Sequence, residues 1–158
     1  MTKPIVVGLI SDTHGQLRPE ISRLFKGVDL IVHAGDVGGH AVLRDLAVIA
    51  PVLAVSGNID DRQDPLLPRE RSIPVGTLRL HVSHGDELGQ PKPELLLATY
   101  DAEVIVYGHT HRPVLLRDSG RMVVNPGAAG PRRFNLTPGI AKLVVQGSFA
   151  EVELITLS

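Results

Sequence analysis

Five short apolar stretches of this sequence each end in side chains that can bind a metal ion, usually beside a glycine. The first three run into SDTH (11–14), HAGD (33–36) and SGN (56–58), and two later ones into SHGD (83–86) and GHTH (108–111). Turns favour Asp, Asn and Gly but have no use for histidine, so turn chemistry alone does not explain these endings. The pattern indicates a reactive site assembled from the ends of the stretches.

The candidate ligands are carboxylate, amide and imidazole groups, without a thiol among them. They are Asp12, His14, Asp36, Asn58, His84, His109 and His111. Oxygen and imidazole donors together suit Mn²⁺, Fe²⁺, Co²⁺, Ni²⁺ or Zn²⁺. The set exceeds what one ion with an open position needs, and it fits two ions that share a carboxylate and lie about 3.5–4 Å apart. Such a pair suits displacement at phosphorus, because the ions neutralise phosphate oxygens and lower the pKa of a bridging water.

Some of these residues also have an ordinary structural explanation. Asp12 and His14 can cap the helix that is expected after them, and Gly-Asn at Asn58 is common turn chemistry. The recurrence of histidine downstream favours the ligand interpretation for all three.

For three histidines, the sequence leaves open whether they belong to the reactive site or have a purely structural role. His84 ends its apolar stretch beside a glycine, whereas His81 lies inside that stretch, so we expect His84 in the site and His81 at the surface or hydrogen-bonded. His33 lies within LIVHAG, and we expect a hydrogen-bonded core histidine there, with orientation of a ligand carboxylate as the alternative.

The elements that must position these residues alternate in the first half of the chain. Residues 4–10, 29–35 and 51–57 are predicted as buried strands, with helices over 18–26 and 40–50 between them. This βαβαβ order predicts parallel strands with right-handed crossovers. Ligands in such folds sit at the carboxyl ends of the strands, which is where the candidate residues stand.

The second half of the chain predicts further strands and one helix. Two antiparallel strands should join near residues 75–77, a helix should cover 91–100, and a buried strand should cover 102–108. The short runs after Pro113 are predicted as antiparallel strands. We therefore expect an α/β fold with two sheets packed face to face and helices outside. The sequence shows no linker and no internal repeat, so residues 1–158 are expected to form a single domain.

Composition limits the function classes. Formal net charge is −1 and there is no Trp, which gives no support for nucleic-acid binding by a basic surface or by an aromatic platform. The absence of cysteine excludes a disulfide framework, a thiolate zinc site and a thiol nucleophile. The first residues have neither a secretory signal pattern nor a membrane span, so a cytoplasmic protein without membrane partners is expected.

The ordered set of motifs resembles the calcineurin-like metallophosphoesterases, in particular their small bacterial and archaeal phosphodiesterases of the YfcE type. The resemblance rests on Asp12-x-His14, Gly35-Asp36, Gly57-Asn58, His84 and Gly108-His109-Thr110-His111, in this order. The segment VNPGAAGPR (124–132) is similar to their Asn-Pro-Gly segment.

The resemblance implies a fold and a set of roles. The fold would be a four-layer αββα sandwich of two mixed sheets. One ion, most often Mn²⁺, would be held by Asp12, His14, Asp36 and His111. The other would be held by Asp36, Asn58, His84 and His109, with Asp36 bridging. A hydroxide between the ions would attack a small phosphodiester directly, with Asp36, Asn58 and His109 as catalytic residues. Homodimers or homotetramers are implied as well. Apart from the resemblance, Arg132 and Arg133 follow the Asn-Pro-Gly turn and are candidates for binding a phosphate oxygen, with a solvated surface position as the alternative for each.

One position departs from the pattern of many such enzymes, which carry Gly-Asn-His where this chain has Gly57-Asn58-Ile59. That histidine would assist the transition state or protonate the leaving oxygen, and isoleucine can do neither. We therefore expect activity on activated aryl phosphodiesters to exceed activity on alkyl phosphomonoesters. The alternative function is a catalytically weak protein-binding scaffold like Vps29, although the intact ligand set favours the enzyme. A nuclease of the same superfamily is disfavoured, because the sequence shows no basic stripe and no extra capping domain to hold a polymer.

Overall fold

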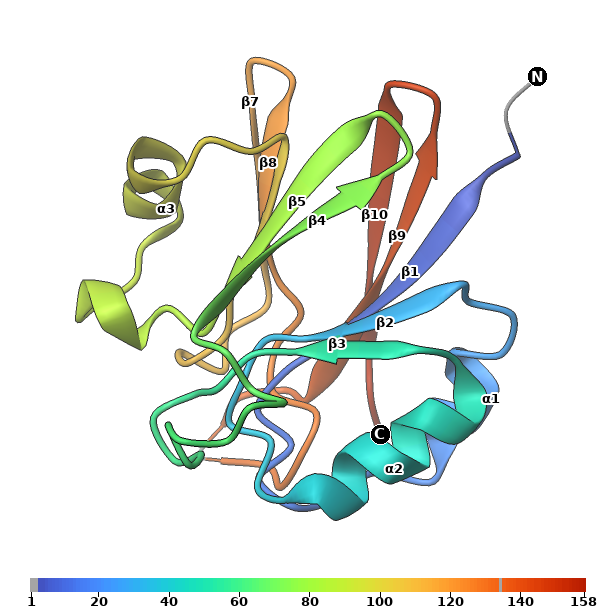
Figure 1. Cartoon of the computed structure of the whole chain (residues 1–158), viewed down its shortest axis with the longest axis vertical. Coiled ribbons are helices and arrows are strands. Elements are labelled where there is room, and N and C mark those ends of the chain that lie inside the picture. Colours follow the sequence, from blue (N-terminus) through green and yellow to red (C-terminus); the bar gives the residue numbers. More distant parts are fainter. Residues whose placement is uncertain (1–2, 134) are drawn as a thin grey trace.

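A five-stranded mixed sheet contains the first predicted βαβαβ unit in the computed structural model, which describes residues 3–133 and 135–158 (Figure 1). Its strands, in the order β10-β9-β1-β2-β3, are β1 (Ile5–Ile10), β2 (Leu30–His33), β3 (Val52–Ala54), β9 (Gly139–Gln146) and β10 (Phe149–Thr156). Strands β1, β2 and β3 are parallel, as predicted, and β9 and β10 add to the sheet in antiparallel fashion.

The second sheet has the order β4-β5-β6-β8-β7. Its strands are β4 (Glu70–Val75), β5 (Leu78–Ser83), β6 (Val104–Val106), β7 (Val114–Asp118) and β8 (Arg121–Asn125). Strands β4 and β5 form the predicted antiparallel pair. The expectation of purely antiparallel strands after Pro113 is wrong for β8, which pairs antiparallel with β7 but parallel with β6. Strand β7 takes the edge, and its hairpin returns the chain beside β6.

Helices cover the outer faces of both sheets and are shorter than predicted. They are α1 (Glu20–Leu24), α2 (His40–Ile49), α3 (Pro93–Thr99) and the 3-10 helix η1 (Asp86–Leu88). Helices α1 and α2 lie on the first sheet, whereas α3 lies beside the second (Figure 1). Helix α1 is followed by Gly27 at φ +86°, a left-handed conformation that turns the chain into β2.

Three hydrophobic clusters fill the three interfaces of this four-layer αββα arrangement. Strand β1 shows how the sequence assigns them, because Val7 and Leu9 point into the cluster between the sheets and Ile10 points to the helix side. In β6, Val104 and Val106 face the first sheet while Ile105 packs on the side of α3. The alternation of successive side chains in a strand therefore produces layers on both faces of each sheet.

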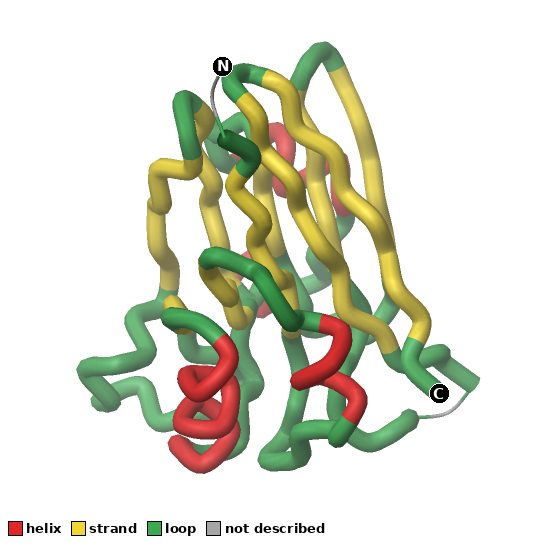
Figure 2. The backbone as a smooth tube through the Cα atoms, turned by 90° about the vertical axis from the view of Figure 1, so that its right-hand side faces the viewer, coloured by secondary structure: helices red, strands yellow, loops and turns green. Residues whose placement is uncertain are grey.

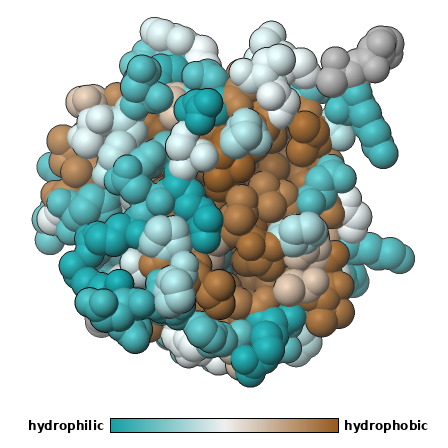
Figure 3. Space-filling model, viewed as in Figure 1, coloured by the Kyte–Doolittle hydropathy of each residue, from teal (hydrophilic) through white to brown (hydrophobic). Residues whose placement is uncertain are grey.

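The carboxyl ends of the parallel strands meet at one end of the molecule. Figure 2 shows the long loops gathered at the lower end of the sheets, beside α1 and α2. On the face seen in Figure 3, hydrophobic surface covers much of the right-hand half, and hydrophilic residues cover much of the left. Over the described residues, the helices are too short and too polar to cross a membrane. The candidate ligands, which follow these strands in the sequence, are therefore expected at this end of the molecule.

Candidate metal centre

The structure brings the seven candidate ligands together from both sheets. Those that follow β1, β2 and β3 come from the first sheet, and those that follow β5 and β6 come from the second. The first-sheet residues are Asp12, His14, Asp36 and Asn58, and the second-sheet residues are His84, His109 and His111. The contacts between these side chains place the other five around the carboxylates of Asp12 and Asp36.

The carboxylates of Asp12 and Asp36 lie in the middle, with imidazoles on both sides. Asp36 Oδ2 is 3.4 Å from the Nε2 atoms of both His14 and His84. Asp12 Oδ1 is 3.3 Å from His111 Nε2 and 3.8 Å from His84 Nε2. Two groups of donor atoms lie within 4.8 Å of one another, Asp12 with His14 and His111, and Asp12 with Asp36 and His84. Asp12 therefore belongs to both groups, and Asp36 faces a histidine of each.

Each carboxylate has one oxygen bonded to the protein and the other directed to the histidines. Asp12 Oδ2 accepts hydrogen bonds from the Ser11 hydroxyl at 2.7 Å and from the backbone N–H of His109 at 3.2 Å. Asp36 Oδ1 accepts one from the backbone N–H of Ile59 at 3.1 Å. The two carboxyl groups are thus fixed in orientation by the chain, and their remaining oxygens point into the cluster.

Three buried polar atoms of the cluster have no hydrogen-bond partner among the described residues. They are Asp12 Oδ1, His14 Nε2 and His84 Nε2. Leaving a buried donor or acceptor unpaired costs about 1–3 kcal/mol, so a cluster of three converging atoms requires a reason. Oxygen and imidazole donors around one space are a fitting set for divalent cations, which would satisfy all three.

A hydrogen bond at one ring nitrogen of His84 fixes which ring nitrogen faces the cluster. Its Nδ1 donates to the carbonyl of Ala34 at 2.8 Å, which leaves Nε2 facing the two carboxylates. Burial alone would lower the pKa of this imidazole, but Asp36 and Asp12 outweigh burial and raise it to about 9. A cation at Nε2 would take the place of that proton.

The carboxyl groups respond to the same neighbours in the opposite direction. Burial tends to raise the pKa of Asp12, but the imidazoles of His111, His14 and His84 hold it well below its usual range. The pKa of Asp36 is lowered as well, because His84 and the Ile59 N–H overcome the effect of burial. Both groups are therefore carboxylates at neutral pH, the form that binds cations.

The backbone is strained at five of the seven candidate ligands. Asp12, His14, Asp36, His109 and His111 have φ between +48° and +71°. Among the described residues other than glycine, only Ser119 shares this left-handed conformation. It costs roughly 1–2 kcal/mol per residue, and such strain gathers at functional sites. The left-handed backbone at these residues thus lowers the stability of the fold while it orients their side chains.

Asn58 and His109 lie at the outer side of the cluster. His109 Nδ1 is 3.2 Å from Asn58 Oδ1, and the His109 ring meets the His84 ring edge-on with centroids 5.2 Å apart. Asn58 is exposed and His109 half-buried, unlike the fully buried Asp12 and His84. These two residues therefore stand where the cluster opens to solvent.

Comparison with known proteins agrees with this geometry. Residues 5–148 match the family described as the calcineurin-like phosphoesterase superfamily domain. The chain belongs to this superfamily. It is a phosphoesterase of a divalent-metal-dependent family, as the sequence motifs indicate.

Relatives of this phosphoesterase occur in archaea and bacteria. It is 33% identical over 162 residues to a probable metallophosphoesterase of Methanocaldococcus jannaschii, covering 97% of this chain and 82% of the relative. It is 31% identical to the phosphodiesterase YfcE of Escherichia coli, covering 75% and 76%. Vacuolar protein sorting 29 of Cryptosporidium parvum has the same fold, with a TM-score of 0.81, 22% identity and 98% coverage of both chains.

Asp60 holds two ligand loops of the phosphoesterase together. Its carboxylate accepts hydrogen bonds from the backbone N–H groups of Val37 at 3.1 Å, Gly38 at 3.1 Å and Gly57 at 2.8 Å. The loops after β2 and β3 are thereby joined. The sequence shows a carboxylate after Asn58 but gives no sign of these partners, because two of them lie more than twenty residues away.

His33 is the hydrogen-bonded core histidine that the sequence predicts. The N–H of Gly35 donates to His33 Nδ1 at 3.1 Å, so Nε2 carries the proton and donates to Thr13 Oγ1 at 3.0 Å. The Thr13 hydroxyl in turn donates to the carbonyl of Val37 at 2.7 Å. This chain of bonds links the Asp12 and Asp36 loops, which agrees with the alternative orienting role too.

The structure also places the basic side chains of His81, Arg132 and Arg133, for which the sequence makes predictions. His81 is buried, not at the surface, and its ring stacks on Tyr100 with centroids 3.8 Å apart, while Nε2 has no partner among the described residues. Arg132 and Arg133 are exposed, and Arg133 Nη2 is 3.4 Å from His14 Nδ1. Arg133 thus contacts the cluster directly.

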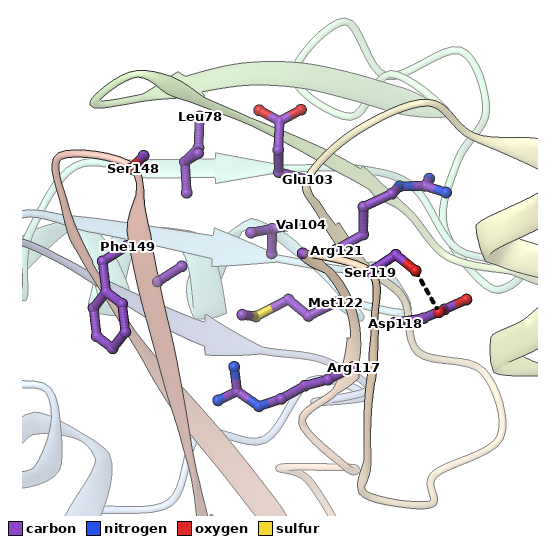
Figure 4. A pocket seen from close by; sticks show the side chains of 12 residues that line it. Leu78, Glu103, Val104, Arg117, Asp118, Ser119, Arg121, Met122, Ser148 and Phe149 are labelled. Carbon is purple, nitrogen blue, oxygen red and sulfur yellow. Dashed lines mark hydrogen bonds between the residues drawn. The ribbon is translucent and has the colours of Figure 1, made fainter.

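A cavity of about 350 Å³ lies at the opposite ends of the strands from the cluster (Figure 4). It is lined by Leu78, Val104, Met122, Phe149 and Arg117, from the hairpin ends of both sheets. Whereas His84 and His109 follow β5 and β6, Leu78 and Val104 begin these strands. The cavity therefore has no part in the candidate metal centre.

Proposed function

We propose that residues 1–158 act as a single-domain phosphodiesterase that depends on two divalent metal ions and hydrolyses small phosphodiesters directly. The observation that supports this most is the convergence of unpaired Asp12 Oδ1, His14 Nε2 and His84 Nε2 on two oriented carboxylates. The named phosphodiesterase among the relatives supports the substrate class.

We assign the ligands to two ions. One would be held by Asp12, His14, Asp36 and His111, and the other by Asp36, Asn58, His84 and His109. Asp36 would be the shared ligand, since its Oδ2 lies 3.4 Å from both His14 Nε2 and His84 Nε2. Mn²⁺ is our first candidate, although Ni²⁺, Co²⁺, Fe²⁺ and Zn²⁺ suit the same donors. When bound, the ions supply positive charge against phosphate oxygens and lower the pKa of water.

The chain's own residues then orient the ester and stabilise its charge. The ring of His109 and the amide of Asn58 lie at the open side, where an approaching phosphate would meet them. His109 would donate a hydrogen bond to the phosphate oxygen that gains charge in the transition state. Arg132 and Arg133 extend from the segment beside His14 and are our candidates for binding a non-bridging oxygen. Water attacks phosphorus directly, and no covalent enzyme intermediate is required.

Substrate choice follows from the missing proton donor at Ile59. General acid catalysis contributes about 10²–10⁴-fold, and its loss matters most for alkoxide leaving groups. We therefore propose activated aryl diesters as better substrates than alkyl monoesters.

Elemental analysis of the purified protein, combined with a screen of phosphomonoesters and phosphodiesters with Mn²⁺, Ni²⁺, Co²⁺ and Zn²⁺, tests the proposal. We expect close to two ions per chain and hydrolysis of bis(4-nitrophenyl) phosphate. Protein that binds no metal and hydrolyses no ester would instead be a protein-binding scaffold like Vps29.

The proposed cellular setting is the cytoplasm, without a membrane or specific nucleic-acid partner. Fractionation of cells that express the tagged protein tests the compartment. Light scattering of the purified protein tests the homodimer or homotetramer that the family resemblance implies.

A further inference from the structure

A cavity of about 360 Å³ adjoins the candidate metal centre and shares His109 with it. Its volume lies in the lower part of the range of small-molecule sites, roughly 300–1,000 Å³. Apolar walls come from Pro91, Pro93 and Val114. The cavity therefore offers space for a group attached to a phosphate that is bound at the cluster.

Among the described residues, the side chains that line this cavity include two cations, Lys92 and Arg112, and no carboxylate. Both are exposed, and neither forms an ion pair with an acidic side chain in the described part of the chain. By contrast, Arg62 and Arg69 each form an ion pair with Asp86 at 3.8 Å. The cavity thus presents positive charge that the protein itself does not neutralise.

The wall that carries Arg112 is held by hydrogen bonds that connect it to the buried Asn125. Thr110 Oγ1 accepts from the backbone N–H of Arg112 at 3.3 Å and from Asn125 Nδ2 at 3.1 Å. Asn125 Nδ2 also donates to the carbonyl of Gly108 at 3.1 Å. On the other wall, Pro91 and Pro93 restrict the backbone on either side of Lys92. The two cations therefore extend from backbone segments of defined conformation.

We propose that this cavity binds a second anionic group of the substrate, a phosphate or carboxylate joined by a short carbon chain to the phosphodiester at the cluster. The inference rests on the proposed function, because the cluster must hold the reacting phosphate. Arg112 would bind the second group through its planar guanidinium and Lys92 as a point charge. The apolar walls would contact the connecting carbons. The substrate class is then phosphodiesters with a second negative charge near the reacting phosphorus.

The test measures binding of three phosphonates to the manganese-loaded protein by calorimetry. Propylphosphonate has an uncharged tail, 3-phosphonopropanoate a carboxylate tail, and propane-1,3-diphosphonate a phosphonate tail. We expect the compounds with a second anionic group to bind about tenfold more tightly than propylphosphonate, since two solvent-exposed ion pairs, with Lys92 and Arg112, are added. The compound with the larger advantage identifies whether the second group is a carboxylate or a phosphate.

Variants locate the effect. In the double variant Lys92→Gln/Arg112→Gln, the advantage of the charged tails should fall to about twofold or less. The matched control Lys26→Gln/Arg117→Gln removes the same charges away from the cavity and should retain the full advantage. Equal binding of all three compounds by the wild type, or an undiminished advantage in the first double variant, would overturn the proposal.

Hydrolysis of bis(4-nitrophenyl) phosphate, which has no second anionic group, is measured in parallel on the wild type. If this ester is hydrolysed and the charged tails give no advantage, the subsite is wrong and the proposed function stands. If no ester is hydrolysed but the advantage is present and lost in the double variant, the anion site stands and the proposed function is wrong.

Discussion

Ile59 lies beside the candidate ligand Asn58, and its backbone and side chain have separate consequences. The backbone N–H donates to Asp36 Oδ1, so this position helps to orient a ligand whatever its side chain is. The side chain is 49% exposed and is not needed for the hydrophobic core. The departure from the Gly-Asn-His pattern therefore replaces an ionisable imidazole by an aliphatic side chain and leaves the hydrogen bond to Asp36 in place.

The variant Ile59→His restores an imidazole at the open side of the cluster. We expect it to raise kcat/KM for methyl phosphodiesters by about tenfold or more, and for nitrophenyl diesters by much less, because nitrophenolate leaves without a proton. Steady-state kinetics on both ester series measure the difference. The control Leu66→His places an imidazole on another exposed aliphatic position and should change neither rate. An equal effect of Ile59→His on both series would show that position 59 is not near the leaving oxygen.

His33 gives the metal-free protein a dependence on acidity. Its complete burial lowers the pKa to about 4 from a usual value near 6.5, although Asp12, Asp60 and Asp36 favour the protonated form. Between these pH values the unfolded chain binds a proton that the folded chain does not. Stability from this residue is therefore complete above pH 6.5 and is lost as the pH falls towards 4, by about 3 kcal/mol.

Denaturant unfolding of the metal-free protein between pH 7 and pH 4 measures this loss. The variant His33→Gln retains an amide N–H for Thr13 but does not titrate, so its stability should fall less over the same interval. Identical pH dependence in the variant and the wild type would show that His33 is not responsible.

At the scale of elements, the site depends on loops that hold one another. Asp60 joins the loop after β2 to the loop after β3 through three backbone N–H groups. Close approach is part of this arrangement, because a Cβ added to Gly57 would lie 2.1 Å from Asp36 Oδ1. A change in one loop should therefore be felt by the ligand in the other.

The variant Asp60→Asn places an amide N–H₂ among backbone N–H groups. We expect a loss of about 1–3 kcal/mol of unfolding free energy and a 10–100-fold weaker affinity for metal. Denaturant titration and calorimetric titration with Mn²⁺ measure these changes. Asp61→Asn is the matched control, since Asp61 is exposed and accepts a hydrogen bond from Gln63. Wild-type affinity in Asp60→Asn would show that the ligand loops do not depend on this carboxylate.

The elements themselves were predictable where a local pattern exists. Continuous apolar runs located β1, β2 and β3, and the position of Asp12, Asp36 and Asn58 at their ends followed from parallel pairing. The direction of β8 was not predictable, because alternation of apolar residues is the same in parallel and antiparallel strands. The cavity beside His109 was not predictable from the sequence either, because Lys92 and Arg112 are brought together only by the tertiary fold.

At the scale of the whole molecule, the cluster joins the two sheets through polar groups. Asp12 and Asp36 come from the first sheet, and they face His84 and His111 from the second. The hydrophobic cluster between the sheets supplies contacts along the rest of their length. A cation bound at the carboxyl ends would thus connect both sheets of the folded state and would have no equivalent site in the unfolded chain.

Metal should therefore stabilise the whole fold. At a free Mn²⁺ concentration of 100 times Kd, mass action adds about 2.7 kcal/mol, which raises the melting temperature by roughly 5–10 °C for a chain of this size. Calorimetric scans of chelator-treated protein with and without Mn²⁺ measure the shift. In His84→Ala the shift should shrink strongly. His81 is a buried histidine inside β5, the strand that His84 follows, and it lies outside the cluster, so His81→Ala should lose stability in both scans yet retain the shift. Equal melting temperatures with and without metal in the wild type would mean that the cluster does not bind Mn²⁺ in the folded state.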